Sequence, residues 1–224
     1  MKIWRLHIRP SSENTNPVKF CIERGIVGFG WPVDKVPISK GEYLELGENK
    51  YGYSGWRKAA NALLNRVKKD DLIWFRGFDN VYYLSRITGD WEYSCDEENR
   101  KADIINFRDA EIYQVGTNVP GKLVNSFIPG ATLQASNSET LAEYSKSLFN
   151  DLSGTKRYSQ GNKKYDLFDL LSYTDIEDLV ALYLQIEKEL IFVPSSRGKR
   201  NDTLFFEYEL ISKNSQEYYA QVKS

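Results

Sequence analysis

The sequence is poor in the residues on which most metal, redox and membrane proteins depend. It contains one histidine, His7, and two cysteines, Cys21 and Cys95, which do not have the spacing of metal ligands. We therefore expect two free thiols in an intracellular protein, with a disulfide between them as the alternative. No apolar run approaches the length of a membrane span, and charges interrupt the N-terminal MKIWRLHIRP, where a signal peptide would have its apolar region. These absences predict a cytoplasmic protein with no membrane partner.

A large excess of charge of one sign is also missing. The 224 residues include 30 basic and 31 acidic side chains, which gives a net charge of −1 at pH 7. A uniformly basic surface is thereby excluded, and any contact with nucleic acid must come from local patches. The apolar content of 41%, with 14% aromatic residues, is that of a globular protein, and the length suits two modest domains.

The N-terminal part has the pattern of several short strands separated by glycine-containing turns. Residues 2–8 place alternate side chains on opposite faces, and residues 72–75 and 82–87 predict a hairpin with its turn near Gly77. We also expect a strand over 20–29, irregular structure over 33–53, a helix over 55–67 and a charged loop over 96–101. The pattern predicts a small β-barrel that ends near Gly130.

A helix followed by KKDDLIWF and then by the strand YYLSRI resembles PUA-like domains of the EVE type. The resemblance covers about half of the chain and implies a nucleic-acid recognition domain over residues 1–132. Some members of that family hold a modified or flipped-out base in an aromatic pocket. Trp31 and Trp91 follow glycine-containing turns and are the predicted stacking residues, joined by Tyr82 and by Asp90, which could read a base edge. The alternative is that these aromatic residues form the core and that Asp90 caps a turn.

Residues 133–165 are expected to connect two domains through a helix over 139–149 and a polar, locally basic loop over 153–164. Beyond them, a helix over 175–189 and a strand over 190–193 precede a hairpin formed by 204–211 and 218–223. In an antiparallel hairpin this spacing sets Glu207 or Glu209 opposite Gln221, with Lys223 two residues further along. Carboxylate and amide oxygens beside an ammonium group suit a hard divalent cation and a phosphodiester.

The segment from Asp175 to Ser224 resembles the Mrr-like branch of the PD-(D/E)xK nuclease superfamily, through IEDLV on the helix, a carboxylate on the next-to-last strand and Gln221-Val-Lys223. The resemblance implies a catalytic Lys223, Gln221 beside the metal, and Glu177 completing the site. Mg²⁺, or Mn²⁺, would be held by Glu207 with Gln221, and Asp202 is the alternative carboxylate. The basic residues of the preceding loop would contact phosphates, and they are Arg197, Lys199 and Arg200.

Glu177 also has a purely structural explanation, because Thr174 and Glu177 have the spacing of a capping box. Members of the superfamily continue past the lysine strand, so the resemblance further implies that the nuclease-like domain, over residues 166–224, is truncated or is completed by another chain.

The sequence therefore predicts an α+β protein in which a PUA-like β-barrel precedes a truncated α/β restriction-endonuclease-like domain. The expected function is metal-dependent endonuclease cleavage of DNA, of the restriction type, guided by the N-terminal reader domain. The expected partners are DNA, with modified bases as one candidate target, and a second copy of the chain in a homodimer. The alternative is a non-catalytic module that binds DNA or RNA. Continuation of the natural chain by about 60 residues would favour catalysis.

Overall fold

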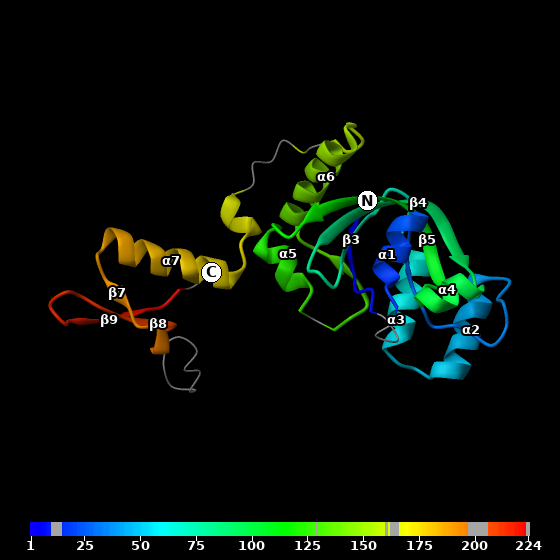
Figure 1. The fold of residues 1–224 in the computed structure, drawn as a ribbon, viewed down its shortest axis with the longest axis horizontal. Helices are drawn as coiled ribbons and strands as arrows, with labels where there is room; N and C mark the ends of the chain where they lie inside the picture. The colour runs from blue at the N-terminus through cyan, green and yellow to red at the C-terminus, as the bar shows by residue number, and fades with distance from the viewer. Residues whose placement is uncertain (10–14, 129, 160, 162–165, 197–205, 223–224) are drawn as a thin grey trace. The chain divides into compact units, whose positions relative to one another are not determined.

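The computed structural model describes residues 1–9, 15–128, 130–159, 161, 166–196 and 206–222. The chain divides into two compact units (Figure 1). Unit 1 comprises Met1–Val119 and Ser126–Lys164, and unit 2 comprises Pro120–Asn125 and Tyr165–Ser224. Both units contain helices and strands, so the expected α+β class is confirmed. Among the described helices, none combines the length and the apolar character needed to cross a bilayer.

Unit 1 is built on a six-stranded mixed sheet with the strand order β2-β5-β4-β3-β1-β6. β1 runs parallel to β3, and the other neighbouring strands are antiparallel. The strands are β1 (Ile3–Leu6), β2 (Ile26–Phe29), β3 (Leu72–Arg76), β4 (Tyr82–Tyr93), β5 (Asn106–Gly116) and β6 (Leu133–Ser136). The expected closed barrel is wrong for the described residues, because β2 and β6 are the edges of this sheet and do not pair with each other.

Three stretches that were expected to be a strand, irregular structure and a loop form helices instead. Residues 20–29 split into the end of α1 (Pro17–Arg24) and strand β2, because Asn16 caps the helix by accepting from the Lys19 N–H and Gly25 ends it with a φ of 63°. The other two are α2 (Lys40–Tyr51), capped by Ser39, and α4 (Glu97–Ala102), capped by Asp96. In each of these three helices, the side chain of the capping residue accepts a hydrogen bond from a backbone N–H of the first turn.

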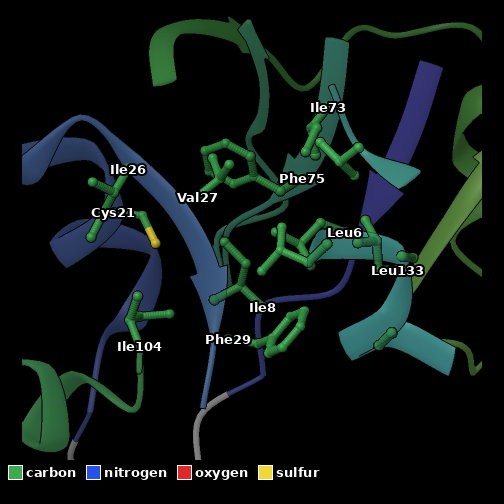
Figure 2. Packing of buried hydrophobic residues seen from close by; sticks show 14 of the residues in the cluster. Leu6, Ile8, Cys21, Ile26, Val27, Phe29, Ile73, Phe75, Ile104 and Leu133 are labelled. Atoms are coloured by element: carbon green, nitrogen blue, oxygen red, sulfur yellow. The ribbon is translucent and has the colours of Figure 1, made fainter. Parts of the chain in front are cut away.

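The core of unit 1 lies between one face of the sheet and the helical segments that cover it. The side chains of β1 alternate as expected, since Trp4 and Leu6 lie in this core with Ile8. Leu6 and Ile8 are shown in Figure 2 with Ile73 and Phe75 of β3. Ile3 and Arg5 are buried as well, so β1 is covered on both faces. The core is covered by α1, α3 (Gly55–Asn61) and the π-helical turn η1 (Ala62–Arg66), with Tyr43 of α2 and Ala102 of α4 at its margin.

The hairpin of β3 and β4 lies in unit 1. The residues that were expected to form a linker also belong largely to unit 1. The hairpin is confirmed, with Trp74 opposite Leu84. Within the expected linker over 133–165, β6 pairs with β1, and α6 (Glu139–Ser153) packs on the face of β3 opposite the core. The Trp74 indole N–H donates to Ser145 Oγ of α6 over 2.9 Å.

Unit 2 contains a three-stranded sheet with the order β7-β8-β9, and the long helix α7 (Tyr173–Glu187). Its strands are β7 (Ile191–Phe192), β8 (Tyr208–Ile211) and β9 (Glu217–Ala220), and it also includes α5 (Gly121–Ser126), η2 (Leu167–Leu170) and η3 (Pro194–Ser196). The order helix, strand, strand, strand is the one expected. On α7, Leu179 and Tyr183 are exposed, and the helix meets the sheet through the hydrogen bond from the Tyr208 hydroxyl to the Glu177 carbonyl.

Candidate functional site

Unit 1 has a cleft of about 450 Å³ at the end of the core where β2 leaves the sheet. The lining combines aromatic, apolar and charged groups from segments far apart in the sequence. Its residues are His7, Ile8, Arg9, Phe29, Gly30, Trp31, Pro32, Tyr51, Asp103, Ile104 and Thr132. Of the four residues predicted to bind a base, Trp31 is the one that lines this cleft.

The backbone that carries Trp31 is held by side-chain hydrogen bonds at four successive residues, 30–33. Asn106 Nδ2 donates to the Gly30 carbonyl over 2.7 Å, and the Tyr43 hydroxyl donates to the Trp31 carbonyl over 3.1 Å. The Tyr51 hydroxyl donates to the Pro32 carbonyl over 2.5 Å, and the Val33 N–H donates to the Tyr93 hydroxyl over 3.0 Å. Each residue of the loop therefore has a fixed position.

This anchoring explains the backbone of Trp31, which has a φ of 62°. A bulky residue adopts this left-handed conformation only where the surroundings compensate for its cost, of about 1–3 kcal/mol. The Trp31 ring is half-buried and contacts Phe29, with 4.9 Å between the ring centroids. The indole is thus presented to the cleft in one orientation before any ligand arrives.

Asn106 is the centre of the network behind the cleft. The side chain is fully buried, and Nδ2 also donates to the Tyr43 hydroxyl over 2.9 Å. Its Oδ1 accepts from the Trp91 indole N–H over 3.2 Å. Trp91 therefore supports the loop from behind, and its ring packs with Tyr43 and Tyr93.

The phenols of this network stay protonated at neutral pH. Burial raises the pKa of Tyr43, and burial together with the hydrogen bond from Cys95 raises the pKa of Tyr93 to about 12. Burial, followed by the negative charges of Asp34 and Asp103, raises the pKa of Tyr51, against an opposing effect of Lys50. The hydroxyl donors that hold the loop are consequently present over the whole physiological range of pH.

One wall of the cleft bears a carboxylate, that of Asp103. This residue ends α4 in a left-handed conformation with a φ of 56°, and its N–H donates to the Arg100 carbonyl over 3.2 Å. Its carboxylate lies against the α-carbon of Gly30, where a Cβ atom would overlap Oδ1 and would stand 2.7 Å from Cγ. Gly30 is therefore needed for close approach, and Arg9 lines the same cleft.

The other predicted base-binding residues of unit 1 lie elsewhere. Tyr82 is 3% exposed and packs edge-on against Phe127, with 5.6 Å between the ring centroids. The Asp90 side chain is 98% exposed and lies 3.6 Å from the buried guanidinium of Arg108. Trp91 has the supporting position described above.

In unit 2, the hairpin has the register that was expected for Glu207. Tyr208 pairs with Ala220, so the same register, extended by one residue, sets Glu207 opposite Gln221, whereas Glu209 is opposite Tyr219. The Glu207 carboxylate accepts from the Val222 N–H over 2.9 Å, which holds it at this end of the hairpin.

Glu177 does not form the capping box that was its structural explanation. The helix begins earlier than expected, and its capping box joins Ser172 and Asp175. Glu177 meets the hairpin through its carbonyl, which accepts from the Tyr208 hydroxyl over 3.1 Å. Tyr208 thus faces α7, and alternation along the strand directs Glu207 toward the opposite face of the sheet.

Asp202 and Lys223, together with the predicted phosphate contacts Arg197, Lys199 and Arg200, lie outside the described residues. Within the described part of the chain, no three or more His, Cys, Asp and Glu side chains gather where they could hold a metal ion.

The chain matches no protein-family model and no curated protein sequence.

Sequence reasoning missed four residues of the cleft wall: His7, Arg9, Tyr51 and Asp103. Tyr51 was assigned to irregular structure and Asp103 follows a stretch read as a loop, so neither pattern indicated a site. The available signal was the Gly28-Phe29-Gly30-Trp31-Pro32 run, where a glycine beside a tryptophan indicates close approach of another group.

Proposed function

We propose that unit 1 binds nucleic acid by receiving one unstacked base in the cleft, with Trp31 as the stacking platform. The observation that carries the proposal is the preorganised indole of Trp31 at the wall of a cleft of about 450 Å³. This volume is in the range of small-molecule sites and is sufficient for a nucleobase. Stacking on an aromatic ring contributes about 1–3 kcal/mol per base, and preorganisation avoids the cost of ordering the loop on binding.

The charges around the cleft suit binding of single-stranded DNA in which electrostatic attraction contributes only modestly to the affinity. Arg9 lines the cleft and is exposed, so its guanidinium can contact the phosphate beside the inserted base. With a net charge of −1, the chain does not provide a general attraction for polyanions. The affinity for DNA should therefore depend mainly on contacts in the cleft and only weakly on the ionic strength.

Binding of a short single-stranded DNA to the full chain, measured by fluorescence anisotropy, tests this proposal. Trp31→Ala should weaken binding by roughly 5- to 150-fold, the loss of one stacked base. Phe78→Ala is the matched control, because Phe78 is 61% exposed and lies outside the cleft. Equal affinities for the wild type and both variants would exclude the cleft as the site.

A second function, metal-dependent cleavage of the bound DNA by unit 2, is favoured by a separate observation. The hairpin register, extended by one residue beyond Tyr208 and Ala220, sets Glu207 opposite Gln221, as the nuclease resemblance implies. Glu177 lies on α7, which the opposite face of the sheet meets through Tyr208, so the support comes from the hairpin alone. The oxygens of Glu207 and Gln221 are ligands of the kind that Mg²⁺ or Mn²⁺ prefers. When bound, such an ion supplies charge stabilisation at the phosphate and a more acidic water. Lys223 would orient the attacking water or neutralise developing charge on the phosphate, and Asp202 is the alternative carboxylate.

Cleavage of plasmid DNA carrying modified or unmodified bases, in the presence of Mg²⁺, tests the second function. Glu207→Gln and Lys223→Ala should each abolish cutting while DNA binding is retained. Glu209→Gln is the matched control, because Glu209 lies two residues away on the same strand opposite Tyr219. Cutting that survives both Glu207→Gln and Lys223→Ala would remove this hairpin from the mechanism.

A further inference from the structure

We propose that Asp103 makes the cleft of unit 1 selective for guanine among the bases of a DNA strand. The inference rests on the proposed binding of a base beside Trp31 and adds which base is preferred. Its basis is the position of one carboxylate on the wall of a cleft whose stacking ring is already in place.

The carboxylate of Asp103 has a fixed position for two independent reasons. Its backbone ends α4 in the left-handed conformation, with the N–H donating to the Arg100 carbonyl. Its side chain rests on Gly30, the residue immediately before Trp31, where a Cβ atom would overlap Oδ1. The acceptor thus packs against Gly30, the residue next to the one that carries the stacking ring, and Asn106 holds the Gly30 carbonyl.

A carboxylate is an acceptor only, and it can receive a pair of parallel N–H groups. Guanine is the DNA base that presents two adjacent donors on its Watson–Crick edge, the N1–H and the exocyclic amine. Adenine and cytosine place a ring acceptor beside their amine, and thymine flanks its single N–H with two carbonyls. A carboxylate has about four lone-pair sites, so Asp103 can accept from a base while it retains another partner.

The ligand side is tested with short thymidine oligonucleotides that carry one central guanine, hypoxanthine, adenine or cytosine. Hypoxanthine keeps the ring N–H of guanine and lacks only the amine. The wild-type full chain should bind the guanine strand more tightly than the adenine or cytosine strand by roughly 5- to 150-fold, with hypoxanthine between them. Equal affinity for all four strands would overturn the selectivity.

The protein side is tested with Asp103→Asn, whose asparagine is compatible with the left-handed backbone. Guanine binding should fall toward the adenine value, while adenine binding should hold or improve, because the amide supplies a donor. Asp109→Asn is the control, since Asp109 is an exposed carboxylate that also rests on a glycine, Gly89, away from the cleft. A uniform loss with all bases would overturn the role of Asp103.

The two proposals fail in different ways. Binding that depends on Trp31 but does not distinguish guanine from hypoxanthine or adenine would overturn the role of Asp103 and leave the base cleft standing. Binding that is independent of Trp31 would overturn the cleft itself. If Asp103→Asn does not fold, as judged by its thermal transition, the comparison of guanine with hypoxanthine in the wild type decides the question.

Discussion

Replacement of Asn106 by alanine should destabilise unit 1 by about 2–4 kcal/mol, and the structure shows how this figure arises. Asn106 is fully buried and makes three hydrogen bonds, to the Gly30 carbonyl, the Tyr43 hydroxyl and the Trp91 indole. The Gly30 carbonyl is buried as well. A buried polar group left without its partner costs about 1–3 kcal/mol.

The loss of stability in Asn106→Ala depends on which of the three former partners can form a hydrogen bond to water instead. The Trp91 ring is half-buried, so its N–H contributes the least. Tyr43 keeps its bond to the Trp31 carbonyl and contributes only in part. The Gly30 carbonyl therefore accounts for most of the loss, and the small cavity left by the deleted amide adds to it. The same change should allow the loop to move, so DNA affinity should fall even under conditions where the variant is folded.

Urea denaturation followed by tryptophan fluorescence measures this effect in unit 1 alone. All five tryptophans of the chain, at positions 4, 31, 56, 74 and 91, belong to unit 1. Asn65→Ala is the control, because the Asn65 side chain is exposed and should change stability by less than about 0.5 kcal/mol. A difference between Asn106→Ala and the wild type of less than about 0.5 kcal/mol would refute the reasoning that this network anchors the loop.

Three further predictions concern the same unit and use the same assay. Trp31→Gly should be more stable than Trp31→Ala by about 1 kcal/mol, because only glycine adopts the left-handed φ of 62° without strain; the reverse order would argue against that backbone. Asp71→Asn should cost about 1–3 kcal/mol: Asp71 is 3% exposed, one carboxylate oxygen accepts from the Trp4 indole and the Lys68 N–H, the other accepts from the Lys2 N–H, and an amide would oppose one of these N–H groups with its own. Burial raises the pKa of the Cys21 thiol from 9.0 to about 12, so between these values the unfolded chain binds fewer protons than the folded one. The free energy of unfolding should therefore fall as the pH rises from about 9 towards about 12, by up to about 1.4 kcal/mol per pH unit, and less steeply in Cys21→Ala.

The strands with strong local patterns could be predicted from the sequence. The alternation of β1, the hairpin of β3 and β4, and the hairpin near the C-terminus depend on residues that are close in sequence or joined by a short turn. The register of the last hairpin was left open between Glu207 and Glu209 opposite Gln221, and the structure decided for Glu207. The helices α1 and α2 were not predicted, because their capping residues, Asn16 and Ser39, are also common in loops.

The sequence by itself determined where the aromatic side chains are concentrated and that Trp31 lies in a glycine-rich turn. Only the tertiary structure decided that Trp31 lines a cleft while Trp91 supports the loop from behind, and that Asp103 lies against Gly30. The physical reason is that Asn106 and Asp103 reach the Trp31 loop from elements more than 70 residues away, as the separation of 76 residues between Asn106 and Gly30 illustrates. Such contacts follow from the packing of the sheet against its helices, and no local pattern of residues encodes them.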